Sequence, residues 1–248
     1  MPAPLIHDPV IILGLGFTTQ RLARRLRARG ITIYDAKTAK DIPPGAILVH
    51  SVPPLAEPSN SAIHALITAI QPRRILYISS TGVYGSQTNV GASTPASPND
   101  EKGRARLAEE QWIADPTFSG RSSLILRSAA IYGPGRGVHV RLREGKLPRG
   151  AGGVVSRIHV DDLGSILEAG IDSELEGAWP VADEHPAASE EVVAWCANRM
   201  GIGLPEDSRQ HFPVTGRKVD GRKIRELLGV TLAYPSYHTG IPASLQEE

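Results

Sequence analysis

The feature that most constrains the fold is a glycine-containing turn between an apolar run and a helical segment near the start of the chain. The apolar run at 10–13 is followed by Gly14-Leu-Gly16 and then by a segment at 20–29 with helical periodicity. A second apolar run at 31–34 ends at Asp35. Strand, glycine turn, helix and strand form a βαβ unit, which closes with right-handed topology and parallel strands.

The rest of the first half repeats this alternation. Further apolar runs predict strands at 46–52, 74–78 and 123–127, and apolar residues at helical spacing predict helices at 62–70 and 103–114. Strands that alternate with helices are typical of an open parallel sheet. The sequence therefore predicts an α/β protein with a Rossmann-type doubly wound parallel sheet.

After Tyr132 the sequence changes to a glycine-rich and basic stretch, followed by shorter periodic segments. We expect residues 1–132 to form the nucleotide-binding domain and residues 133–248 to form a small C-terminal substrate lobe. Part of that lobe is expected to return to the same sheet, because no linker long enough to separate two independent domains is present.

Composition narrows the class of protein. The 248 residues carry 27 Lys and Arg against 26 Asp and Glu, so net charge gives no argument for nucleic acid or membrane as a partner. No stretch approaches the roughly 18 apolar residues of a membrane helix. The first nine residues lack a basic start before an apolar run, and the single Cys196 has no intramolecular partner. We therefore expect a cytoplasmic protein.

The glycine turn predicts a dinucleotide site. Gly14 and Gly16 allow the backbone to approach a pyrophosphate, which the helix N-terminus attracts, although Thr19 replaces the third glycine of the usual pattern. Asp35 stands where a carboxylate accepts both ribose hydroxyls and so favours NAD, whereas Lys37 would favour NADP. The alternative is an ordinary turn in which the glycines provide positive φ and Asp35 caps a loop.

Three further segments carry a family resemblance. They are Ile78-Ser-Ser-Thr-Gly-Val-Tyr-Gly85, Leu126-Arg-Ser-Ala-Ala-Ile-Tyr-Gly-Pro-Gly-Arg136 and Ile158-His-Val-Asp-Asp-Leu163. In order and spacing they resemble the extended and atypical short-chain dehydrogenase/reductases, which include nucleotide-sugar epimerases and dehydratases, and most closely the YeeZ-like branch. The resemblance implies NAD or NADP as cofactor, a small-molecule substrate of nucleotide-sugar type, and a homodimer.

The resemblance also implies residue roles. Ser80 would be catalytic, with Tyr84 as a second candidate. Substrate would meet Thr81, Arg104, Arg136 and His159, and no metal is expected. The implied cofactor-binding residues are Gly14, Gly16, Phe17, Thr18, Asp35, Ser51, Val52, Pro53, Ser79 and Ala130.

One departure concerns the chemistry. The family uses a Tyr-x-x-x-Lys pair in which the lysine lowers the pKa of the catalytic phenol. Counted from Pro98, the tyrosine position is Asn99 and the lysine position is Gly103. Either Tyr84 or Tyr132 would have to substitute. Two hypotheses therefore stand: an NAD(P)-dependent epimerase, dehydratase or reductase, and a catalytically lapsed NAD(P)-binding sensor.

Two groups of arginines remain. Those at 21, 24, 25 and 29 fall largely outside the apolar stripe of the first helix, and we expect them to form solvated surface. The basic run at 136–149 has two interpretations, a grip on a substrate diphosphate or a solvated loop.

Overall fold

The predicted parallel sheet is present. The computed structural model describes residues 8–38, 42–43, 45–117, 121–146, 153–204 and 216–248. Its main sheet has six strands in the order β10-β6-β4-β3-β1-β2, and every neighbouring pair is parallel. The strands are β1 (Val10–Leu13), β2 (Ile33–Asp35), β3 (Ile47–His50), β4 (Arg74–Ser80), β6 (Ser122–Ser128) and β10 (Gly177–Val181).

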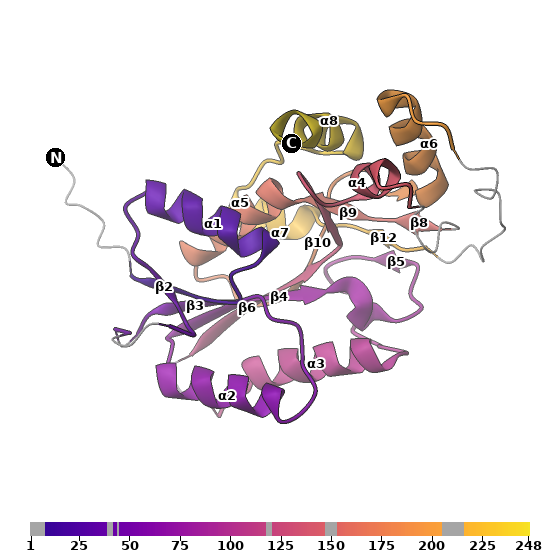
Figure 1. Ribbon diagram of the computed structural model, residues 1–248. Helices are drawn as coiled ribbons and strands as arrows, with labels where there is room; N and C mark the ends of the chain where they lie inside the picture. The colour runs from indigo at the N-terminus through magenta and orange to yellow at the C-terminus, as the bar shows by residue number, and fades with distance from the viewer. Residues whose placement is uncertain (1–7, 39–41, 44, 118–120, 147–152, 205–215) are drawn as a thin grey trace.

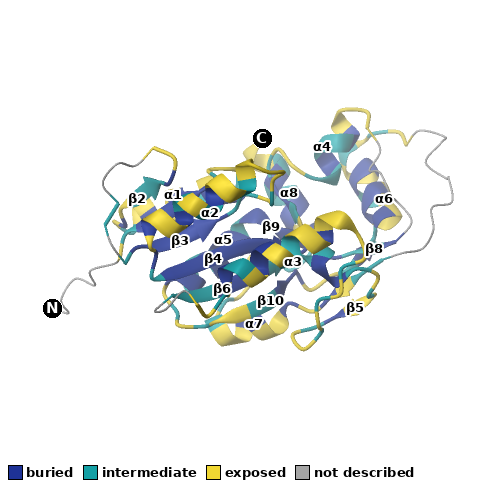
Figure 2. Cartoon of the chain, turned by 90° about the horizontal axis from the view of Figure 1, so that it is seen from below, coloured by how far each residue is buried: buried dark blue, intermediate teal, exposed yellow. Residues whose placement is uncertain are grey.

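Helices cover both faces of this sheet. In Figure 1, α1 (Phe17–Ala28) and α5 (Val160–Ile171) lie on one face, and α2 (Ser59–Ile70) and α3 (Glu101–Ile113) lie on the other. The helices turn exposed faces outward and buried faces to the strands, as Figure 2 shows. The predicted Rossmann-type architecture is therefore confirmed. Within the described residues, no helix is long and apolar enough to cross a bilayer.

Of the remaining elements, α7 (Arg222–Leu228) packs beside α5 and against β10, and the others gather beyond the carboxyl ends of the strands (Figure 1). Three two-stranded pairs join β5 to β12, β7 to β9 and β8 to β11. The strands of these pairs are β5 (Asn89–Val90), β7 (Ala130–Tyr132), β8 (Val154–Val155), β9 (Arg157–His159), β11 (Ala187–Ala188) and β12 (Lys218–Val219). The helices are η1 (Thr81–Tyr84), α4 (Val138–Arg143), α6 (Ser189–Met200), α7 (Arg222–Leu228) and α8 (Tyr237–Glu247).

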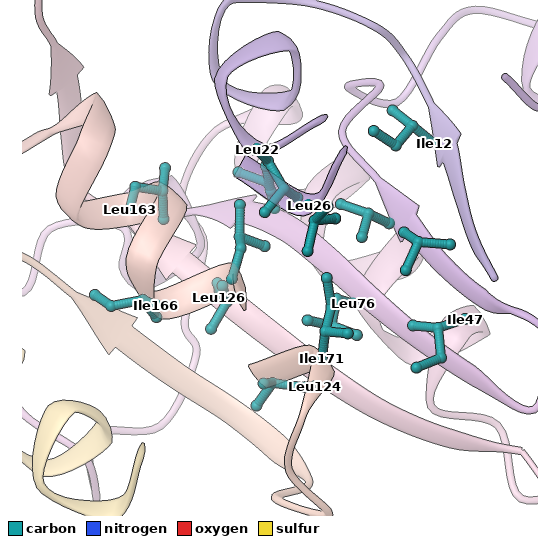
Figure 3. Packing of buried hydrophobic residues seen from close by; sticks show 14 of the residues in the cluster. Ile12, Leu22, Leu26, Ile47, Leu76, Leu124, Leu126, Leu163, Ile166 and Ile171 are labelled. Atoms are coloured by element: carbon teal, nitrogen blue, oxygen red, sulfur yellow. The ribbon is translucent and has the colours of Figure 1, made fainter. Parts of the chain in front are cut away.

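Two apolar layers hold the sheet to its helices. Figure 3 shows the layer beneath α1 and α5, where Leu22 and Leu26 meet Leu163 and Ile166 above the strand residues Ile12, Ile47, Leu76, Leu124 and Leu126. The opposite layer packs α2 and α3 against the other face of the same strands. Because successive side chains of a strand point to opposite faces, strands covered on both sides are mostly apolar, as β1 is throughout and β3 is up to His50.

Of the four arginines that the sequence suggested as solvated surface, Arg24 is exposed, but the other three pair with carboxylates of α5 or its C-cap. Arg21 pairs with Asp161, and Arg25 and Arg29 both pair with Glu168 on α5. Arg29 also reaches Asp172. The partners lie about 140 residues away in the chain, so helical periodicity alone could not show them. These ion pairs fasten the rims of α1 and α5 above their shared apolar layer.

A buried arginine closes the amino edge of the sheet. Arg74, the first residue of β4, is fully buried and donates to the Ser122 hydroxyl at 2.9 Å. It also donates to the Leu175 carbonyl at 2.6 Å and the Gly170 carbonyl at 3.3 Å, between α5 and β10. Through its two terminal nitrogens, the buried guanidinium fixes these segments in relation to each other.

Asp183 makes stability depend on pH. The residue is 2% exposed, one oxygen accepts from the His185 amide, and the other has no partner. Burial raises its pKa from 3.8 to about 7. The folded protein therefore keeps a proton that the unfolded chain releases above about pH 4, and stability from this group is lost as the pH rises towards 7.

We predict that the free energy of unfolding of the wild type, relative to Asp183→Asn, falls by about 2 kcal/mol between pH 5 and pH 8. Denaturant titration of both proteins at the two pH values measures it. Asp115→Asn is the control, because Asp115 has a lowered pKa and stays ionised over this range. An unchanged difference for Asp183→Asn would contradict the prediction.

Candidate functional site

The glycine turn after β1 packs against the end of β3. Gly14 has φ of 92°, and a Cβ placed on it would lie 2.8 Å from both Ser51 Oγ and Val52 Cγ2. Only glycine fits this position, because both the backbone conformation and the available space exclude a side chain. The first glycine of the motif is therefore fixed by packing.

Thr19 completes the turn in place of the third glycine. Its hydroxyl oxygen accepts from the Gly16 amide at 2.9 Å and donates to the Gly14 carbonyl at 2.6 Å. The Ser51 hydroxyl donates to the same carbonyl at 2.6 Å. The sequence analysis treated Thr19 as a departure, and the structure shows that its side chain closes the turn as a capping residue.

The turn opens on a cleft of about 620 Å³ at the carboxyl ends of the strands. A Cβ on Gly16 would meet nothing within 4 Å, so the backbone at this point is open to the cleft. Phe17 and Thr18, the first residues of α1, line it together with Ser51 and Pro53. Backbone amides and the positive end of α1 thus face open space of the size a dinucleotide needs.

The end of β4 supplies hydroxyl groups to the same cleft. Ser79, Ser80 and Thr81 all line it. The Ser80 hydroxyl accepts from the Gly82 amide at 3.1 Å and so caps η1. The Ser79 hydroxyl donates to the buried Glu110 at 2.5 Å. Ser79 is therefore held by the protein, whereas Ser80 and Thr81 are half-buried and line the cleft.

Arg106 is the site residue that the sequence analysis missed. It projects from α3 into the cleft and donates to the Tyr77 hydroxyl at 2.9 Å and the Ile78 carbonyl at 3.2 Å. The sequence feature that could have identified Arg106 is its spacing. Arg106 follows Lys102 by four residues, the same spacing that separates the tyrosine and the lysine in the Tyr-x-x-x-Lys pair. Counting from Pro98 placed that pair three residues earlier.

The position assigned to the lysine, Gly103, has no room for a side chain. A Cβ there would lie 2.8 Å from the Gly82 carbonyl and 2.9 Å from Pro98 Cβ. Asn99, at the assigned tyrosine position, lines a second pocket of about 520 Å³ that shares Thr81 and Ala130 with the cleft. Arg217 also lines it and donates to the carbonyls of Thr81, Gly85 and Gln87.

Ten of the residues proposed from the sequence meet in the cleft: Gly16, Phe17, Thr18, Ser51, Pro53, Ser79, Ser80, Thr81, Ala130 and Arg136. Gly14 and Val52 pack directly beneath it. Asp35 ends β2 beside Ile12 of β1, and its carboxylate accepts from the Lys37 amide. Arg104 is exposed on α3 and is not among the described lining residues. Of the basic run at 136–149, residues 147–149 lie outside the described residues.

The structure does not bring either candidate phenol into the cleft. Tyr84 is fully buried, its ring lies against Arg127, and its hydroxyl receives a long 3.4 Å contact from that side chain. Tyr132 is buried and donates to the Ser236 carbonyl. Burial raises the pKa of both phenols. No tyrosine occurs among the described residues that line the cleft.

His159 also lies away from the cleft. It is fully buried as the N-cap of α5, where Nδ1 accepts from the Asp161 amide and Nε2 lies 3.2 Å from the Ser244 hydroxyl. Burial lowers its pKa to about 4, so it is neutral at physiological pH. The sequence placed it at the substrate because local pattern cannot distinguish a buried helix cap from an exposed imidazole.

Comparison with the profiles of known protein families finds no match. Protein YeeZ of Escherichia coli K12 is 28% identical, and the match covers 91% of this chain and 96% of YeeZ. A 3-diazoavenalumate denitrifying reductase from a Streptomyces species is 29% identical over 158 residues, which span about half the length of each protein. The expected resemblance to YeeZ is thus confirmed.

Several solved structures share this fold over nearly the whole chain. A conserved protein of unknown function from Silicibacter pomeroyi has a TM-score of 0.75 at 29% identity, over 97% of this chain and 99% of that one. A putative NAD-dependent epimerase/dehydratase from Methylobacillus flagellatus has a TM-score of 0.74 at 24% identity, and the match covers 97% of this chain and 98% of that one. The Bordetella bronchiseptica enzyme WbmG, in complex with NAD and UDP, has a TM-score of 0.76 at 18% identity, and the match covers 97% of this chain and 94% of that one.

We predict that Gly14→Ala lowers the free energy of unfolding by about 1–3 kcal/mol, because it combines positive φ with contact between Cβ and β3. Gly16→Ala is the matched control, since it has φ of −109° and open space around the added carbon. Thermal melts of both variants measure the effect. Equal melting temperatures for the two variants would contradict it.

Proposed function

We propose that the protein is an NAD(P)-dependent oxidoreductase that transfers hydride to or from a small hydroxylated substrate of nucleotide-sugar type. The observation that carries this proposal is that one cleft holds both the glycine turn with its helix N-terminus and the hydroxyls at the end of β4. The first can bind a dinucleotide and the second can orient a reacting oxygen. The complexes of similar folds with NAD, and the half-length similarity to a reductase, support it.

The nicotinamide ring, when bound, supplies or accepts the hydride. This chain would bind and orient the substrate oxygen with three groups. Ser80 donates a hydrogen bond to the substrate oxygen, and Thr81 lies between the cleft and the second pocket, where the substrate would extend. Arg106 places a positive charge beside them, which favours a developing alkoxide as the family lysine would.

The alternative function is that of a sensor, which binds NAD(P) but does not catalyse a reaction. It is favoured by the burial of Tyr84 and Tyr132, which leaves the described lining without a phenol to exchange the proton. Such a protein would bind the dinucleotide and report its redox state through the lobe beyond the strands. Turnover by the wild type on any substrate decides against it.

Cofactor binding tests both functions. We predict that the protein binds NAD, and that Gly16→Val blocks binding because its side chain fills the phosphate position. Gly203→Val is the control, as its added carbon also meets nothing within 4 Å. Calorimetry on each folded variant measures the affinity. If the wild type binds neither NAD nor NADP, both functions fail.

Cofactor preference is expected to depend on Asp35. Because its carboxylate repels a 2′-phosphate and accepts from ribose hydroxyls, Asp35→Ser should shift the NAD-to-NADP affinity ratio towards NADP by about tenfold or more. The same titrations measure the ratio for wild type and variant. An unchanged ratio would remove Asp35 from the ribose site.

The assignment of roles is tested by turnover on a panel of nucleotide sugars. We predict that Ser80→Ala and Arg106→Ala each lower kcat by about 10–100-fold, with Arg106→Lys retaining more activity than Arg106→Ala. Tyr84→Phe should leave kcat within about twofold, since its hydroxyl faces Arg127 in the interior. Loss of turnover in Tyr84→Phe alone would restore the phenol as the acid/base.

A further inference from the structure

The loop at 133–137 brings Arg136 to the amino end of α1. Its guanidinium carbon lies 5.3 Å from the centre of the Phe17 ring, and both residues line the cleft. Phe17 is the first residue of α1, where the backbone is open to a ligand. The sequence analysis assigned Arg136 to the substrate, whereas this geometry places its charge beside the turn that would hold a diphosphate.

The loop that carries Arg136 is rich in glycine. Gly135 and Gly137 have φ of 75° and 140°, and within the loop Gly133 and Arg136 exchange two backbone hydrogen bonds of 2.9 Å. Arg136 is itself exposed. Ordering a glycine-rich loop costs conformational entropy, so contacts from other segments help to keep the side chain over the cleft.

Glu248 at the end of α8 provides such a contact. Its Oε1 accepts from the Gly135 amide at 2.6 Å, and its other oxygen pairs with Arg143 of α4. Only 14% of this side chain is exposed, and the contacts lower the pKa of its carboxyl. The neighbouring Glu247 instead pairs with Arg21 of α1, which keeps Asp161 as a second partner.

We propose that Glu248 is a positioning residue that holds the 133–137 loop so that Arg136 meets the diphosphate of the bound dinucleotide. The proposal rests on the proposed function for its ligand, the dinucleotide. The contacts of Glu248 with Gly135 and Arg143, which we call the brace, lie within the chain and do not depend on that ligand. The charge of Arg136 adds to the backbone amides and the positive end of α1, which alone would bind the diphosphate without a side-chain cation.

The brace is tested first without any ligand. Trypsin cleaves after Arg136, and cleavage requires the loop to leave its folded position. We expect Glu248→Ala to speed cleavage after Arg136 by about fivefold or more, with Glu247→Ala at the wild-type rate. Glu248→Gln should fall between them, because its amide oxygen still accepts from Gly135 but does not pair with Arg143. Equal rates in all four proteins would overturn the brace.

NAD affinity tests the role of the loop. Since a freed arginine must be immobilised on binding, Glu248→Ala should weaken NAD binding about three- to tenfold. Arg136→Ala should weaken it at least as much and reduce its dependence on salt. In the double variant the two effects should not add, because Glu248 acts through Arg136. Additive effects, or an equal loss in Glu247→Ala, would overturn the proposal.

The two proposals fail in different ways. If wild type binds no dinucleotide, the proposed function falls and so does the diphosphate as the partner of Arg136, while the proteolysis result still decides whether Glu248 braces the loop. If wild type binds NAD and Glu248→Ala binds equally well, the function stands and the positioning role is overturned.

Discussion

The contact of the Gly14 turn with the end of β3 is the constraint on which the site depends. Because Ser51 and Val52 occupy the space of a Cβ at Gly14, the turn is pressed against the sheet, and α1 begins close to its edge. The hydroxyls of Ser51 and Thr19 both donate to the Gly14 carbonyl and so fix the turn. A larger residue would push α1 outward and with it the amides that face the cleft. Binding geometry is therefore set by packing within the scaffold.

Two adjacent buried glutamates on α3 fix the position of this helix. Glu110 is neutralised by Arg127 and accepts from Ser79, whereas Glu109 is held by His50 and His64. Burying a carboxylate is unfavourable unless it is paired, and both are. The two sites fix α3 beneath the strand ends, which places Arg106, one turn earlier on the helix, in the cleft. α3 thus presents a fixed cation to the cleft.

Sequence patterns predicted five strands of the main sheet and the helices α1, α2 and α3, because apolar runs and helical spacing are visible in the local sequence. They missed β10, where Gly177 and Pro180 interrupt the pattern, since an edge strand that pairs only with β6 tolerates proline. They also missed α8, which contains Gly240 and Pro242 and is stabilised by the burial of Tyr237 and Ile241 rather than by propensity.

The candidate site was predictable to a similar extent. Most of the residues proposed at the glycine turn and after β3, β4 and β6 line one cleft, because parallel strands deliver their carboxyl ends to one edge. Arg106 required the register of α3, and the burial of Tyr84 and His159 required the lobe that covers them. These depend on contacts between distant segments, which no local pattern contains.

The arrangement around Arg74 has a practical consequence. Every described residue that lines the cleft belongs to the carboxyl side of the sheet or to the elements beyond it, while Arg74 seals the other side with carbonyls from α5 and the segment before β10. The exposed turn at Gln71, next to that seal, is consequently the place to attach a fluorophore or a surface anchor. A label there would sit at the far end of the strands and leave ligand access free.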